Sequence, residues 1–120
     1  GLAVPEAFKG MSQDRSFEAV LNFPASEHRE LSNRYGFYSF HARKRMVNSY
    51  LSATLPTPLP SSEAPMAQKR EYINRLSEQK VGRIVVHDSH VADFERYSWL
   101  DSLCEKRQHP ADGLTEYFIK

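Results

Sequence analysis

The segment Val81–His87 (VGRIVVH) constrains the fold of this chain more than any other part of it. It is rich in β-branched residues and nearly continuous in apolar side chains, so both of its faces need burial. A strand inside a sheet meets that need, whereas a half-exposed strand alternates apolar and polar positions. The sequence therefore predicts an interior strand over these residues.

Two other segments predict strands. Ser16–Phe23 (SFEAVLNF) carries apolar side chains at every second position, which is the pattern of a strand with one face on the core. Leu114–Ile119 (LTEYFI) follows a turn at Asp112 and Gly113, and it is predicted to be the last strand.

A long helix is predicted over residues 27–53, after an N-cap at Ser26. Inward-facing positions recur there at spacings of three and four, the period of a helix face. The two stripes are Phe37, Phe40, Lys44, Val47 and Leu51, and beside them Leu31, Tyr35, Tyr38, Ala42 and Met46. Gly36 leaves two alternatives open: two helices that break near this residue, or a short strand over residues 34–40.

Two more helices are predicted further along the chain. One has Ser61 or Ser62 as its N-cap and runs to residue 79, with Pro65 in its first turn, where a missing N–H costs nothing. The other covers residues 90–107. Its apolar stripe is Val91, Phe94, Tyr97, Leu100 and Cys104.

These elements follow the order β-α-α-β-α-β, which predicts an α+β domain with about three helices packed on a small three-stranded sheet. Residues 54–65 hold four of the seven prolines and predict a semi-rigid connection inside one domain over residues 11–120. Residues 1–10 are expected to be a flexible segment or a remnant of an expression vector. Two of three strands would be edges, and exposed edges favour pairing, so a homodimer is a reasonable expectation.

The composition limits which cellular compartment and which classes of partner are expected. A single cysteine, Cys104, excludes an internal disulfide and fits a reducing compartment, so a cytoplasmic location is expected. No apolar run approaches the ~18 residues that a membrane helix needs, so no membrane partner is expected.

Charge is distributed unevenly along the chain. The whole protein has a formal net charge of +1, but residues 31–84 hold nine Lys and Arg against three Asp and Glu, a net +6. Residues 1–30 and 85–120 are net acidic in compensation. A basic centre of this kind attracts anions if its charges share one surface.

The basic centre predicts a candidate binding surface for DNA or RNA, because Arg and Lys contact phosphates and aromatic rings stack on bases. The candidate residues are Arg34, Arg43, Lys44, Arg45, Lys69 and Arg70, with Tyr35 and Tyr38 as stacking partners. The ordinary alternative is a solvated helix face, and the sequence pI of 8.1 is below the value of about 9 that is typical of dedicated nucleic-acid domains.

One polar cluster suggests chemistry. His87, Asp88 and His90 follow the predicted interior strand and precede a predicted helix, where open α/β sheets often hold ligands. Imidazole and carboxylate groups bind zinc and other divalent ions, so these three residues are the candidates for a metal-dependent enzyme. The favoured interpretation is that Asp88 or Ser89 caps the helix and that both histidines are solvated.

Three functional hypotheses remain. The chain lacks a phosphate-binding glycine loop and a Gly-x-Ser-x-Gly motif, so no cofactor is expected and a non-catalytic role is favoured. The first hypothesis is a regulator, adaptor or inhibitor that acts through contacts with a protein partner, anchored by aromatic side chains. The second is nucleic-acid binding, and the third is a metal-dependent enzyme.

Overall fold

The computed structural model describes residues 4–24, 29–47, 59–91 and 93–119, with side chains in the second range described from Arg34 onward. Its centre is a five-stranded mixed sheet in the order β2-β1-β3-β5-β4. The strands are β1 (Ala19–Phe23), β2 (Arg45–Val47), β3 (Val81–His87), β4 (Glu105–His109) and β5 (Leu114–Phe118). The first three run parallel, and β5 and β4 add an antiparallel hairpin beside β3.

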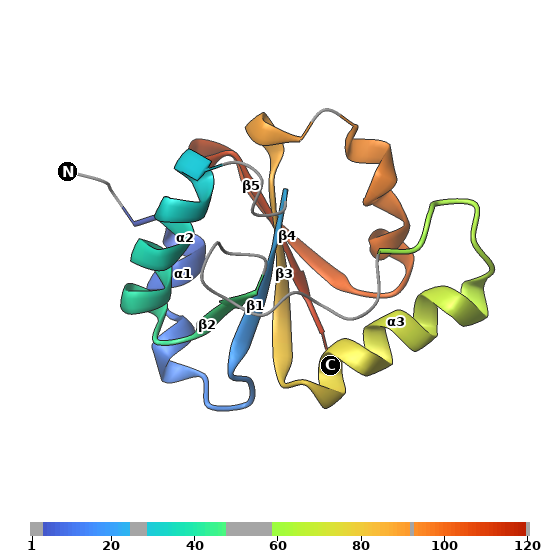
Figure 1. Ribbon diagram of the computed structural model, residues 1–120, viewed down its shortest axis with the longest axis horizontal. Helices are drawn as coiled ribbons and strands as arrows, with labels where there is room; N and C mark the ends of the chain where they lie inside the picture. The colour runs from blue at the N-terminus through green and yellow to red at the C-terminus, as the bar shows by residue number, and fades with distance from the viewer. Residues whose placement is uncertain (1–3, 25–28, 48–58, 92, 120) are drawn as a thin grey trace.

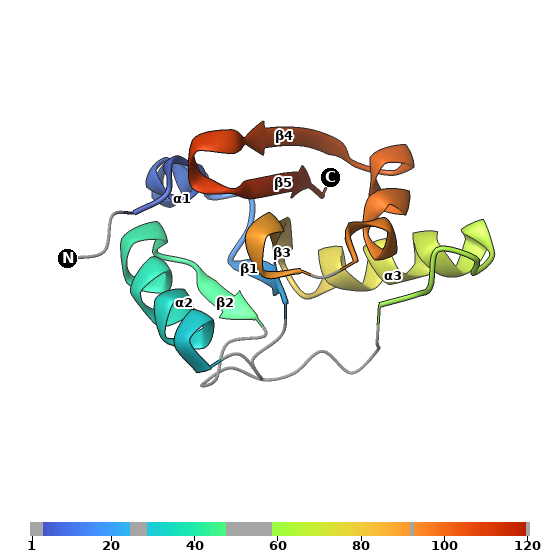
Figure 2. The same cartoon turned by 90° about the horizontal axis from the view of Figure 1, so that it is seen from above.

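Helices cover both faces of this sheet (Figures 1 and 2). The helices α1 (Glu6–Lys9) and α2 (Arg29–Ala42) lie on one face, which we call the α2 face. On the other, the α3 face, lie α3 (Met66–Glu78) and the 3-10 segments that follow β3. The α+β class is therefore confirmed, but the prediction of a three-stranded sheet is wrong, because β2 and β4 were not foreseen.

The strand β3 occupies the middle of the sheet, as its two apolar faces predict. Ile84 and Val86 belong to the core of the α3 face, and Val85 between them belongs to the core of the α2 face. All three side chains are fully buried. Alternation along β1 divides the same way, with Leu21 on the α3 face and Val20 on the α2 face.

The predicted helix over residues 27–53 is too long. It ends at Ala42 because Arg43 adopts a left-handed backbone with φ of 54°, and β2 follows at once and pairs in parallel with β1. The buried stripe of Tyr35, Tyr38 and Ala42 is confirmed. The other stripe is wrong at Phe40, which is 79% exposed.

The predicted helix over residues 90–107 is also wrong. The chain forms short 3-10 segments over Asp88–His90, Phe94–Arg96 and Ser98–Ser102, and then the edge strand β4. The first four positions of the predicted stripe, Val91, Phe94, Tyr97 and Leu100, are spaced by three throughout. Side chains three apart eclipse on a 3-10 helix, whereas an α-helix needs spacings of three and four.

The remaining predictions concern the ends and the connections. The helix α3 begins after Pro65, three or four residues later than a cap at Ser62 or Ser61 would give, and no side chain caps it. Much of the Pro-rich connection at 54–65 lies outside the described residues.

Near the N-terminus Phe8 is fully buried against α2, so residues 5–9 pack into the domain. Among the described residues no helix is long and apolar enough to cross a membrane.

Candidate functional site

The structure separates the predicted basic residues into interior and surface groups. Lys44 is buried, and its Nζ donates hydrogen bonds to the carbonyl oxygens of Asp14 (2.5 Å) and Phe17 (2.7 Å). Lys69 is buried as well, and its Nζ donates to the carbonyl of Ser62 at 2.6 Å and lies over the ring of Trp99. Both ammonium groups hold the fold together and are turned away from solvent.

The two predicted stacking residues are also interior. Tyr35 is fully buried on α2 and its hydroxyl donates to the carbonyl of Pro24 at 2.9 Å. Tyr38 stacks on Phe8 with ring centroids 4.7 Å apart, and burial raises the pKa of its phenol. Neither ring lies where a base would stack on it.

Four predicted cations reach the surface, but they do not form one group. Arg43 and Arg45 are exposed at the start of β2, and the Nη2 of Arg45 donates to the carbonyl of Gln79 at 3.3 Å. Arg34 is half-buried on α2. Arg70 is exposed on α3, which covers the opposite face of the sheet.

The candidate metal cluster divides between the interior and the surface. His87 is 3% exposed, and its Nε2 lies 3.0 Å from Oδ1 of Asn22 on β1. Burial lowers the pKa of His87 to about 3, so the imidazole is neutral. The carboxylate of Asp88 accepts from the hydroxyl of Thr115, and His90 is exposed. The prediction of a solvated His87 is therefore wrong.

These residues do not converge as metal ligands. In the part of the chain that the structure describes, no three His, Cys, Asp or Glu side chains are placed to hold a metal ion. Cys104 is half-buried, and burial raises the pKa of its thiol to about 11, which keeps it protonated at neutral pH.

An aromatic patch on the outside of α2 was missed by the sequence prediction. It consists of Phe40 and His41, which are exposed, and of Phe37, which is half-buried and packs against the core of the α2 face. The ring of His41 lies edge-on to both phenylalanines, with centroids 4.5 Å from Phe37 and 5.3 Å from Phe40. One turn earlier, no atom of the described residues lies within 4 Å of where a Cβ on Gly36 would stand.

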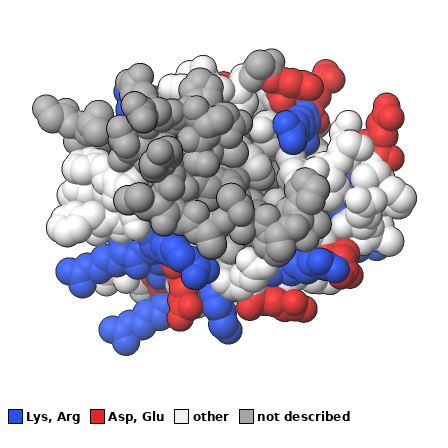
Figure 3. Space-filling model, viewed as in Figure 1, with Lys and Arg blue, Asp and Glu red and all other residues white. Residues whose placement is uncertain are grey.

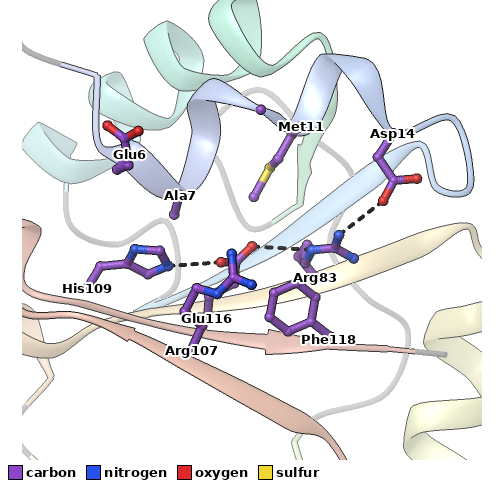
Figure 4. A pocket seen from close by; sticks show the side chains of 10 residues that line it. Glu6, Ala7, Met11, Asp14, Arg83, Arg107, His109, Glu116 and Phe118 are labelled. Carbon is purple, nitrogen blue, oxygen red and sulfur yellow. Dashed lines mark hydrogen bonds and ion pairs between the residues drawn. The ribbon is translucent and has the colours of Figure 1, made fainter.

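A polar cavity on the α2 face was missed as well. It has a volume of about 350 Å³ and lies between α1 and the β3, β5 and β4 strands (Figure 4). Among the lining residues, the side chain of Arg83 is held in place by two ion pairs and two aromatic rings. Its Nη2 lies 3.1 Å from Oδ2 of Asp14 and its Nε lies 3.2 Å from Oε2 of Glu116. Its guanidinium is sandwiched between Phe17 and Phe118, at 4.5 and 4.2 Å from the ring centroids.

Glu116 connects the two sides of the cavity. Its side chain is 5% exposed, and Oε1 lies 2.9 Å from Nε2 of His109 while Oε2 faces Arg83. Arg107 lies opposite Glu116 on β4, yet its guanidinium is placed over the ring of Phe118 at 5.5 Å. Figure 4 shows this side chain directed into the cavity.

Alternation along two strands could have revealed the cavity. In β5 the positions 114, 116 and 118 face α1, and in β4 the positions 105, 107 and 109 do so through their register with β5. Residues 105–107 were predicted to end a helix and His109 fell beyond it, so the alternation that puts Arg107 and His109 on one face of β4 was not recognised.

The chain was also compared with known proteins. No protein-family model matches it, and no match was found among curated proteins or among solved structures.

Proposed function

We propose that this domain acts by binding a protein partner through the outer face of α2. The observation that carries the proposal is Phe40, a large aromatic side chain that is 79% exposed on a helix of 14 residues. Burying a phenylalanine is worth about 1.5–3 kcal/mol, so leaving one exposed forgoes stability unless another molecule covers it.

The surroundings of Phe40 indicate the chemistry of the partner. Phe37 and His41 extend the aromatic patch, and buried aromatic anchors are the residues that dominate binding energy at interfaces. Arg43 is exposed one turn further on, and no ion pair engages it among the described residues. An apolar segment with acidic flanking side chains fits this combination.

The β4 edge of the sheet favours a helix face over strand pairing as the binding surface. In β4 the side chains of Glu105, Lys106 and Arg107 are all exposed. Charged residues on an edge strand discourage a second chain from pairing with it. A homodimer or a heterologous complex would therefore use α2, and self-association is one form of the proposal.

A photo-crosslinking residue at position 40 tests this function. The matched control places the same residue at Met66, which is 40% exposed at the start of α3. We expect position 40, and not position 66, to capture one protein from the native lysate or a second copy of this chain. The purified partner should then bind Phe40→Ser about tenfold more weakly, the loss typical of an interface anchor. Equal capture at both positions, or unchanged affinity, would overturn the proposal.

A second candidate function, nucleic-acid binding, is favoured by a different observation. Arg15, Arg43, Arg45 and Lys80 are all exposed near the point where the parallel strands begin. Figure 3 shows Lys and Arg side chains gathered along this lower edge, with acidic side chains among them. This set replaces the predicted one, because Lys44 and Lys69 point into the protein.

Binding to short DNA and RNA at two salt concentrations tests the second candidate. Contacts with about three or four phosphates predict a marked loss of affinity between about 50 and 200 mM salt. The double variant Arg43→Ala/Arg45→Ala should weaken binding and flatten that salt dependence. Arg96→Ala/Lys106→Ala removes the same charge elsewhere on the surface and should do neither. Equal effects of both pairs would show that the binding is unspecific attraction by net charge.

A further inference from the structure

We propose that the cavity between α1 and strands β3, β5 and β4 binds a small organic monocarboxylate, whose carboxylate pairs with the guanidinium of Arg107 and whose body packs on Phe118. This inference is independent of the proposed function, because Phe40 does not line the cavity.

Arg107 is available because its natural partner is already engaged. Its cross-strand neighbour is Glu116, and opposite charges directly across a strand pair usually meet. Here Oε1 of Glu116 lies 2.9 Å from His109 and Oε2 lies 3.2 Å from Arg83. No carboxylate pairs with Arg107 within the described ranges, which leaves its fork of N–H donors to a ligand.

The rest of the cavity is held in place before any ligand arrives. Arg83 is fixed by two carboxylates and two aromatic rings, so its guanidinium forms a rigid wall. Ala7 and Met11 line the opposite side from α1 and the turn after it, as Figure 4 shows. A preformed site loses little freedom when it binds, and 350 Å³ lies in the range of small-molecule pockets.

The charges around the cavity specify the class of ligand. Arg83 already faces Asp14 and Glu116, so an anion gains its main attraction from Arg107. A dianion such as phosphate would meet repulsion from the carboxylates of Asp14 and Glu116, which line the cavity. A planar carboxylate matches the guanidinium fork and carries one charge, and Phe118 and Met11 offer apolar contact to its body.

Titration of the whole chain with benzoate, followed by NMR, tests the proposal. We expect benzoate at millimolar concentration, the range of a weak fragment, to shift the signals of Arg107 and Phe118. Benzyl alcohol has the same ring without the charge and should not bind. Inorganic phosphate should bind more weakly than benzoate, and comparable affinity would overturn the assignment to a monocarboxylate.

Two substitutions on adjacent positions of β4 complete the test. Arg107→Gln should weaken benzoate binding about tenfold, the loss of one charge-assisted pair. Lys106→Gln removes the same charge from the preceding residue, whose side chain points to the opposite face of the sheet and pairs with Asp101 at 3.2 Å. This control should change the affinity for benzoate by less than about twofold. Equal losses in both variants, or no binding to the wild type, would overturn the proposal. Phe40→Ser should leave benzoate binding unchanged.

Discussion

The two faces of the sheet are made from the same strands but bury different chemistry. On the α3 face, Leu21, Ile84 and Val86 pack against Tyr72 and Leu100 in an apolar layer. On the α2 face the alternate positions of β1, β3 and β5 carry Asn22, Arg83, His87 and Glu116. His87 lies beside the rings of Phe8 in α1 and Tyr35 in α2. The α3 face is stabilised mainly by the close packing of apolar side chains. The α2 face is stabilised in addition by hydrogen bonds and ion pairs, which have defined directions.

This difference assigns the two faces different tasks. The buried polar groups of the α2 face have named partners, such as Asn22 with His87 and Lys44 with two backbone carbonyls. Such bonds are satisfied in one arrangement only, so they specify the position of α2 and of the turn before β1. The apolar layer supplies burial but tolerates exchange of side chains of similar volume.

The largest expected effect is the loss of apolar volume on the α3 face. Leu21 is fully buried in β1, so Leu21→Ala should lower the free energy of unfolding by about 3 kcal/mol through lost burial and a residual cavity. The measurement is urea unfolding at pH 7.5 and again at pH 5. The loss should be equal at both values, since no titrating group is removed, and a loss that depends on pH would contradict the division between the faces.

The next effect separates two neighbouring basic residues. Lys44→Met should cost about 2 kcal/mol, because the carbonyls of Asp14 and Phe17 lose a charged donor inside the α2 face. Arg43→Ala keeps a Cβ at the left-handed position and removes only an exposed side chain, so it should change stability by less than about 0.5 kcal/mol. Chemical denaturation of the two variants measures both values. Similar losses would show that Lys44 is as dispensable as its neighbour.

The sequence predicted the strands well where burial dominates. The positions of β1, β3 and β5 follow from local patterns: alternation in Ser16–Phe23, apolar side chains on both faces in Val81–His87, and the turn that precedes Leu114–Ile119. The strand β2 was missed because its three residues continue the helical spacing of α2, and only the left-handed backbone at Arg43 interrupts it. The strand β4 was missed because the residues of Glu105–His109 are charged or polar, so no apolar period marks them.

The candidate site was harder to predict for a physical reason. Lys44 and Lys69 were predicted to be exposed because they are charged. A long lysine side chain can nevertheless direct its ammonium group inward, where it donates hydrogen bonds to backbone carbonyl oxygens. Phe40 was placed in the core because its spacing matches Phe37 and Lys44. The cavity joins Asp14, Arg83 and Glu116 across wide separations in sequence, and only the order of the strands brings them together.

A third prediction uses the buried imidazole of the α2 face. The pKa of His87 is lowered from 6.5 to about 3 in the folded protein, so below pH 6.5 the unfolded chain binds a proton that the folded protein does not. The contribution of His87 to the free energy of unfolding is therefore fully present above pH 6.5, and it is lost as the pH falls toward 3. Between pH 7.5 and 5 the loss should be about 2 kcal/mol.

The matched variant for this experiment is His87→Gln. Its amide can still donate to Oδ1 of Asn22, as the imidazole Nε2 does at 3.0 Å, but it does not titrate. The wild type should lose more stability on acidification than the variant does, by about the amount given above. Parallel pH profiles of the two proteins would show that protonation of His87 does not lower the free energy of unfolding. The α2 face would then tolerate a charged imidazole, contrary to this prediction.

The smallest expected effect on stability concerns the outer side of the same helix. Phe40→Ser removes a ring that is 79% exposed, so the free energy of unfolding should change by less than about 0.5 kcal/mol. Tyr38→Ser, two residues earlier, removes a ring that is 6% exposed and stacked on Phe8, and it should cost several times more. Thermal unfolding of the two variants measures the contrast. A large loss for Phe40→Ser would mean that its ring is covered within the chain itself, and the aromatic patch would then be part of the fold and not a surface for a partner.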